Sequence, residues 1–134
     1  MKLSILYGLT FVLFILVAKG AWTYTNKSEF CASCHTMNKE YRNWSHSSHG
    51  RWAGCSDCHL PQTNIMTKFA LKTRVGIHDT IAYLFSGDQL RIRISNHGEN
   101  TAMKNCIRCH EVLVSKINKN RKCWECHRGS FHEY

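Results

Sequence analysis

The sequence predicts a mainly α-helical protein in which one N-terminal apolar helix precedes a small domain of short helices and irregular loops. Three observations support this fold class: an apolar N-terminus, eight cysteines grouped in four pairs, and one amphipathic run near the middle of the chain. A chain of 134 residues has room for only one small domain beside such a segment. So small a domain buries too little apolar surface to be stable without disulfides, metals or cofactors.

The first element is the apolar segment Leu3–Ala18, sixteen residues without a charge. It fits a signal peptide that is cleaved before Ala21. It also fits a membrane anchor: sixteen residues are fewer than the about 20 that span a bilayer, but flanking aromatic residues extend the segment to about residue 24. We expect a single-pass anchor at residues 1–24, with domain 25–134 on the periplasmic side of a bacterial cytoplasmic membrane.

The four cysteine pairs share one pattern, in which two residues separate the cysteines and a histidine follows the second. C-x-x-C-H is the attachment motif of c-type haem. The two thiols bond to the two vinyl groups of one porphyrin, and the histidine next to them can reach the iron. We therefore expect a domain wrapped around four covalently bound haem c groups, held by Cys31, Cys34, Cys55, Cys58, Cys106, Cys109, Cys123 and Cys126.

Two other uses of eight cysteines fit part of this pattern. Adjacent pairs are separated by 20 residues in the first half and by 13 in the second, which also fits four-cysteine zinc sites. Disulfides are common in exported chains. Neither use requires the histidine, and nine histidines in 134 residues would follow all four pairs by chance roughly once in fifty thousand sequences. Haem attachment is therefore the favoured interpretation.

The formal net charge of +9 would by itself suggest nucleic acid or another acidic partner. Each ferric haem with ionised propionates contributes about −1, so four haems reduce the charge to roughly +5. We expect no nucleic-acid partner, and a modestly basic surface suited to lipid headgroups or an acidic protein.

The strongest helix signal runs from Ile65 to about Phe85, with Asn64 as its N-cap. The segment Leu90–Ile94, which alternates basic and apolar residues, is expected to be extended or to face headgroups. The helix has an apolar stripe and a polar stripe, and the polar stripe is either a site facing a haem or a solvated surface. The apolar stripe is Met66, Phe69, Thr73, Ile77, Ile81 and Leu84, and the polar one is Lys72, Gly76, Asp79 and Tyr83.

Together, the apolar N-terminus, the first motif a few residues beyond it and the 2+2 spacing of four motifs resemble the NapC/NirT family of membrane-anchored tetrahaem cytochromes c. The resemblance covers essentially the whole chain. It implies a quinol dehydrogenase or electron-transfer subunit of anaerobic respiration that oxidises a membrane quinol, menaquinol, for a periplasmic multihaem reductase. Cytochrome c nitrite reductase is the expected partner. Alternatives are a donor to periplasmic nitrate reductase or other acceptors, and a soluble tetrahaem carrier released by signal cleavage.

The resemblance also implies roles for individual residues near the first two haems. The first motif continues to Met37, as in the family's C-x-x-C-H-x-M, in which the methionine rather than the histidine, here His35, ligates the first iron. Lys72 and Asp79 keep the family's spacing. Lys72 would be the distal ligand of the second haem, with Lys68 as a competitor. In the quinol site beside the first haem, Asp79 would accept a proton and Lys72 would orient the quinol oxygen.

Histidines outside the motifs can supply the other distal ligands. By resemblance, His49 would serve the fourth haem, with His46 as a competitor, and His132 would serve the third. Counting alone does not choose among the five histidines outside the motifs. The assignment by resemblance leaves His46, His78 and His97 without a role. The proximal ligands are the motif histidines His59, His110 and His127.

Overall fold

The computed structural model describes residues 2–86, 93–117, 120–129 and 132. Within these ranges the chain forms helices and turns and no β-strand, so the predicted mainly α-helical class is confirmed. The expected extended segment falls largely outside the described residues. The elements are α1 (Lys2–Thr25), α2 (Ser28–Cys31), η1 (His35–Met37), α3 (Asn38–His46), η2 (Ser48–Arg51), α4 (Cys55–His59), α5 (Ile65–Ser86), α6 (Asn96–His110) and α7 (Cys123–Cys126).

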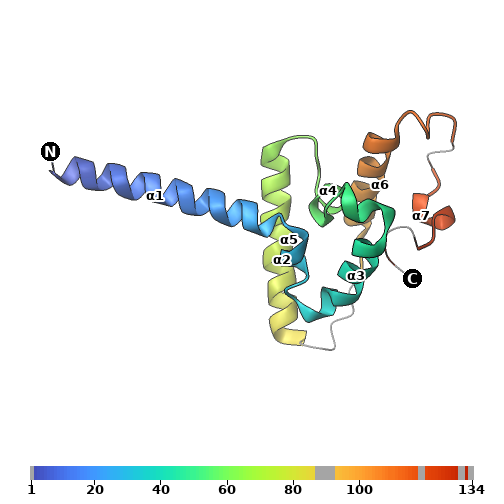
Figure 1. The fold of residues 1–134 in the computed structure, drawn as a ribbon, viewed down its shortest axis with the longest axis horizontal. Helices are drawn as coiled ribbons and strands as arrows, with labels where there is room; N and C mark the ends of the chain where they lie inside the picture. The colour runs from blue at the N-terminus through green and yellow to red at the C-terminus, as the bar shows by residue number, and fades with distance from the viewer. Residues whose placement is uncertain (1, 87–92, 118–119, 130–131, 133–134) are drawn as a thin grey trace.

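Helix α1 extends away from the rest of the protein as a single arm (Figure 1). None of its residues is buried, and it is long and apolar enough to cross a membrane. Helix α5 lies across the end of this arm. Helices α3, α4, α6 and α7 lie on the side of α5 away from the arm, so α5 separates the anchor from most of the domain (Figure 1).

The N-terminus of α5 forms as the sequence predicts. The side-chain oxygen of Asn64 accepts a hydrogen bond of 2.7 Å from the backbone N–H of Thr67. This bond satisfies one of the backbone donors that the first turn of a helix leaves unpaired. The helix then continues to Ser86.

The domain has almost no apolar core made by its own side chains. Leu60, 8% exposed, is the only buried apolar side chain among the described residues. The other buried side chains are polar: Ser28, Thr101 and Asn105. The hydrophobic stabilisation of a domain is roughly proportional to the apolar area that it buries. The four haems that the motifs predict would supply the missing apolar interior.

Hydrogen bonds from the buried polar residues connect the first three motifs. Ser28 Oγ of α2 accepts a bond of 3.2 Å from the backbone N–H of Cys55, at the start of α4. The amide of Asn105 on α6 donates to the carbonyl oxygens of Cys58 and Leu60, at 2.9 and 2.8 Å. Helix α4 is therefore held between α2 and α6.

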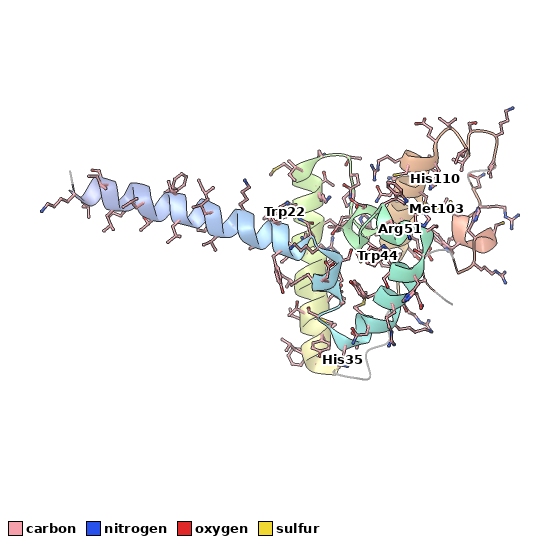
Figure 2. The ribbon with its side chains drawn as sticks, in the orientation of Figure 1. Trp22, His35, Trp44, Arg51, Met103 and His110 are labelled. Carbon is pink, nitrogen blue, oxygen red and sulfur yellow. The ribbon has the colours of Figure 1, made fainter. Side chains whose placement is uncertain are left out.

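Two contacts connect α6 to the fourth motif. The backbone N–H of Cys123 donates to Met103 Sδ at 3.4 Å, and Lys122 forms an ion pair with Glu99. Figure 2 shows Met103 on α6 on the side of the domain remote from α1. The third and fourth motifs are therefore neighbours, as are the first and second.

We expect Asn105→Ala to lower the free energy of unfolding by about 1–3 kcal/mol, because two backbone carbonyls lose their donor. The measurement is denaturant unfolding of the haem-loaded protein in detergent, followed by far-ultraviolet circular dichroism. Asn100→Ala is the control, since Asn100 lies on the same helix and is exposed. Equal unfolding midpoints for the two variants would contradict the role of Asn105.

Candidate functional site

Each cysteine pair lies in or beside a helical segment. The second motif forms α4, the third ends α6, and the fourth begins α7. In the first motif Cys31 ends α2 and Cys34 directly precedes η1. Residues three apart lie on one face of a helix, so each pair can present both thiols to one ligand. All eight cysteines lie among the described residues, and none forms a disulfide.

Thiols of different motifs lie close together, both within each half of the chain and between the second and third motifs. A hydrogen bond with Cys55, together with burial, raises the pKa of the Cys31 thiol. Burial, together with the nearby Cys123 thiol, raises the pKa of Cys106 to about 12. Both shifts include contributions from a cysteine of a different motif. They show that motif one adjoins motif two and that motif three adjoins motif four.

Two pairs of histidine rings are spaced as two ligands of one iron would be. The ring centroids of His49 and His110 are 6.1 Å apart, and those of His59 and His132 are also 6.1 Å apart. Imidazoles on opposite sides of a metal have centroids about 6 Å apart, because each metal–nitrogen bond is about 2 Å long. Desolvation, with a smaller contribution from His132, lowers the pKa of His59 and so favours the neutral form that binds metals. These residues fit haem irons.

A carboxylate lies behind one of these rings. Glu40 Oε2 on α3 is 3.0 Å from Nδ1 of His132, and both side chains are about 30% exposed. This nitrogen is buried and makes no hydrogen bond among the described residues beyond this ion-pair contact. A metal-bound histidine commonly has such a carboxylate at its second nitrogen, where it fixes the orientation of the ring. Sequence spacing offered no signal for Glu40, because it lies near the first motif and His132 follows the last.

The position of His49 is set by the turn that carries it. The side chain of Ser47 caps η2 by accepting a bond of 3.2 Å from the backbone N–H of His49. A Cβ at Gly50 would lie 2.8 Å from the carbonyl oxygen of Trp44, so only glycine fits this close approach. His46, the competitor, instead places Nδ1 2.8 Å from the carbonyl oxygen of Arg42. The structure therefore brings His49, rather than His46, to a motif histidine.

The polar stripe of α5 meets the end of α1 at Lys72. Its ammonium group donates to Thr25 Oγ1 at 2.8 Å and to Asn26 Oδ1 at 3.0 Å, and lies 4.6 Å from the ring centroid of Trp22. Figure 2 shows Trp22 where α1 meets α5. Desolvation lowers the pKa of Lys72. Lys72 is therefore held at the junction of the anchor with the domain.

The same stripe meets the first motif at Tyr83. The Tyr83 hydroxyl is 3.0 Å from Nδ1 of His35, and the two rings pack edge to face with centroids 5.6 Å apart. Figure 2 shows His35 near the C-terminal end of α5 and His110 on the remote side of the domain. One face of α5 therefore links the anchor to the first motif.

Asp79 lies on this face between Lys72 and Tyr83. Its carboxylate is exposed and lies 3.1 Å from Nδ1 of His78, one of the histidines left without a role by the sequence. A Cβ at Gly76 would meet no atom within 4 Å, so the stripe is open beside Asp79. The stripe thus combines a cation, an open stretch and a carboxylate in one row.

The structure groups several predicted ligands differently from the family resemblance. The resemblance assigns His132 to the third motif, whereas its ring contact is with His59 of the second. It assigns His49 to the fourth motif, whereas its ring contact is with His110 of the third. It assigns Lys72 to the iron of the second haem, whereas the Lys72 ammonium group contacts the end of α1. These ligand assignments therefore remain predictions.

The remaining candidates lie apart from these groups. Met37 is half-buried at the end of η1, and His127, just after α7, is exposed, as is His97 near the start of α6. Lys68 donates to Gln62 Oε1 at 2.9 Å, on the turn that precedes α5.

Comparison with known proteins identifies the class that these motifs define. The family model "NapC/NirT cytochrome c family, N-terminal region" matches residues 1–128. The chain belongs to this family, and the prediction of four covalently bound haem c groups is confirmed.

Within the family, the chain is similar to proteins named NrfH. The cytochrome c-type protein NrfH of Wolinella succinogenes is 33% identical, over 91% of this chain and 77% of the relative. The cytochrome c nitrite reductase subunit NrfH of Nitratidesulfovibrio vulgaris is 30% identical, over 81% and 69%. A chain in the crystal structure of the cytochrome c nitrite reductase NrfHA complex bound to the inhibitor HQNO matches with a TM-score of 0.78 and 27% identity, over 96% of this chain and 90% of that one.

We expect Glu40→Gln to raise the reduction potential of one haem and to change its electron paramagnetic resonance signal, because a neutral neighbour makes His132 a less basic ligand. Potentiometric titration and spectra of the haem-loaded protein are the measurements, and Glu40→Asp should restore part of the change. Glu99→Gln is the control, since it removes a carboxylate whose ion pair is with Lys122. Potentials and spectra identical to those of the unmodified protein would rule out a contact between Glu40 and a haem ligand.

Proposed function

We propose that this chain is the membrane-anchored quinol dehydrogenase subunit that delivers electrons to a periplasmic cytochrome c nitrite reductase. Support comes from the similarity to two NrfH proteins and to a chain of the NrfHA complex. Helix α1 anchors the chain in the cytoplasmic membrane through residues 1–24. Residues 25–134 form the haem domain on the periplasmic side.

The observation that carries this function is the polar face of α5. It contacts the end of α1 through Lys72 and the first motif through Tyr83. A lipid-soluble substrate that arrives along the anchor therefore meets this face where α1 joins the domain. When bound, the haems accept electrons one at a time and conduct them toward the reductase.

Quinol oxidation releases two protons as well as two electrons, and the protons need an acceptor. Asp79 is the general base of the proposed site, because it is the carboxylate on the face that joins the anchor to the first motif. Lys72 orients the quinol oxygen by hydrogen bonding. His78, 3.1 Å from Asp79, receives the proton from the carboxylate and passes it to water.

The proposed axial ligands follow from the motifs together with the ring contacts. His59, His110 and His127 would bind the irons of their own motifs, and Met37 would bind the iron of the first motif, because Tyr83 engages His35. His49 and His132 are distal ligands, supported by their 6.1 Å spacing from motif histidines.

We expect Asp79→Ala to slow quinol oxidation by about a hundredfold or more, the usual contribution of a general base. Haem content and full reduction by dithionite should be unchanged, because among the described residues Asp79 contacts His78 and no residue of a haem motif. Stopped-flow reduction of the haems by a menaquinol analogue measures the rate. Glu29→Ala, which removes an exposed carboxylate near the first motif, is the control. Unaltered quinol kinetics in Asp79→Ala would contradict the proposed base.

We expect the protein to co-purify with a larger multihaem protein from membranes solubilised in mild detergent. The complex should reduce nitrite with quinol as the electron donor. Recovery of the chain alone, or with a reductase that does not act on nitrite, would refute the proposed partner while leaving the haem assignment intact.

A further inference from the structure

Helix α5 carries a large apolar surface that the described residues leave exposed. We define its outer face as Met66, Phe69, Ile77, Ile81 and Leu84, which follow one another around less than half of the helix at about 100° per residue. These side chains are between 50% and 73% exposed. An apolar surface of this kind on a protein commonly marks an interaction site.

The apolar stripe of α5 faces away from the domain, which is the reverse of the usual arrangement in a soluble protein. An amphipathic helix normally turns its apolar stripe toward the domain. Here the contacts with the remainder of the domain come from the polar side, through Lys68, Lys72 and Tyr83. The half-buried residues Leu71 and Ala82 lie on that side as well. The apolar stripe therefore lies on the side of α5 opposite these contacts.

The outer face is continuous with the membrane-spanning surface of α1. The rings of Phe69 and Trp22 are in contact, with centroids 5.7 Å apart. Tryptophan at the end of a spanning helix lies at the boundary between lipid and water. Since α5 lies across the end of α1 at this point, it runs along that boundary (Figure 1).

The charged residues of α5 indicate which kind of surface its outer face contacts. Lys68 and Lys72 contact the domain, but Arg74 is exposed next to the outer face, and the only carboxylate of the helix, Asp79, lies on the polar stripe. A helix with an apolar face and an excess of basic residues is suited to the surface of a membrane that contains anionic lipids.

We propose that the outer face of α5 rests on the bilayer, so that α5 is an interfacial helix beside the spanning helix α1. This inference depends on the proposed anchoring by α1. Contact with lipid fixes the height of α5 above the membrane and tilts its polar stripe toward the haem domain. A quinol that leaves the bilayer then passes directly from the apolar face of α5 to its polar face.

The test places the photo-crosslinking residue p-benzoylphenylalanine at Leu84 or Ile77 in the full haem-loaded chain. Vesicles of phosphatidylethanolamine and phosphatidylglycerol supply the lipid, and mass spectrometry identifies the adducts. Trp52 is the matched control, because it is 88% exposed on the haem domain. We expect several-fold more lipid adduct at the two α5 positions than at Trp52. Equal lipid labelling, or labelling chiefly of a second copy or of the reductase, would overturn the proposal.

A second measurement separates this proposal from the proposed function. Ile77→Glu and Leu84→Glu should slow oxidation of a long-chain quinol in vesicles several-fold, while oxidation of a short-chain, water-soluble quinol in detergent stays unchanged. Equal rates with the long-chain quinol for variants and unmodified protein would refute the interfacial role alone. Failure of the unmodified protein to oxidise either quinol would refute the proposed function.

Discussion

Covalent attachment of four haems at four short turns is the constraint on which the structure depends. The described residues bury one apolar side chain, Leu60, so the polypeptide has no interior of its own to define the fold. Four flat apolar macrocycles, each fixed by two thioethers, provide that interior and determine where the chain must turn. The polypeptide therefore needs only helices and turns around the motifs, and the two longest helices, α1 and α5, lie together on one side of the other helices (Figure 1).

With little apolar packing available, polar contacts determine how the motifs are arranged. Ser28 holds the second motif against the first, and Asn105 holds it against the third through two backbone carbonyls. Such bonds are directional, and their loss leaves unpaired carbonyls behind. They are therefore suited to fixing relative positions, which matters for a protein that conducts electrons between cofactors. The contact of Glu40 with the Nδ1 atom of His132 likewise fixes the position of a proposed iron ligand.

The elements encoded by local sequence patterns were predictable, whereas relations between distant segments were not. The Asn64 cap, the span of α5 and the four haem motifs each depend on residues a few positions apart. The approach of His132 to His59 depends instead on how the C-terminus returns to the second motif, and no spacing rule encodes that path. Likewise, periodicity identified an apolar stripe on α5, but the direction in which it faces is set by the contacts of Lys72 and Tyr83.

The two faces of α5 explain how one helix can serve a substrate that is soluble only in lipid. An apolar quinol must reach groups that bind its oxygens and take its protons, and such groups are costly to place within a bilayer. A helix at the boundary resolves this conflict, because its apolar side tolerates lipid while its other side carries Lys72 and Asp79 at the junction with the domain. Trp22 contacts both sides of α5, since its ring packs against Phe69 of the outer face and lies beneath the Lys72 ammonium group. The depth of α1 in the membrane therefore determines the position of α5 and, with it, that of the proposed proton acceptor.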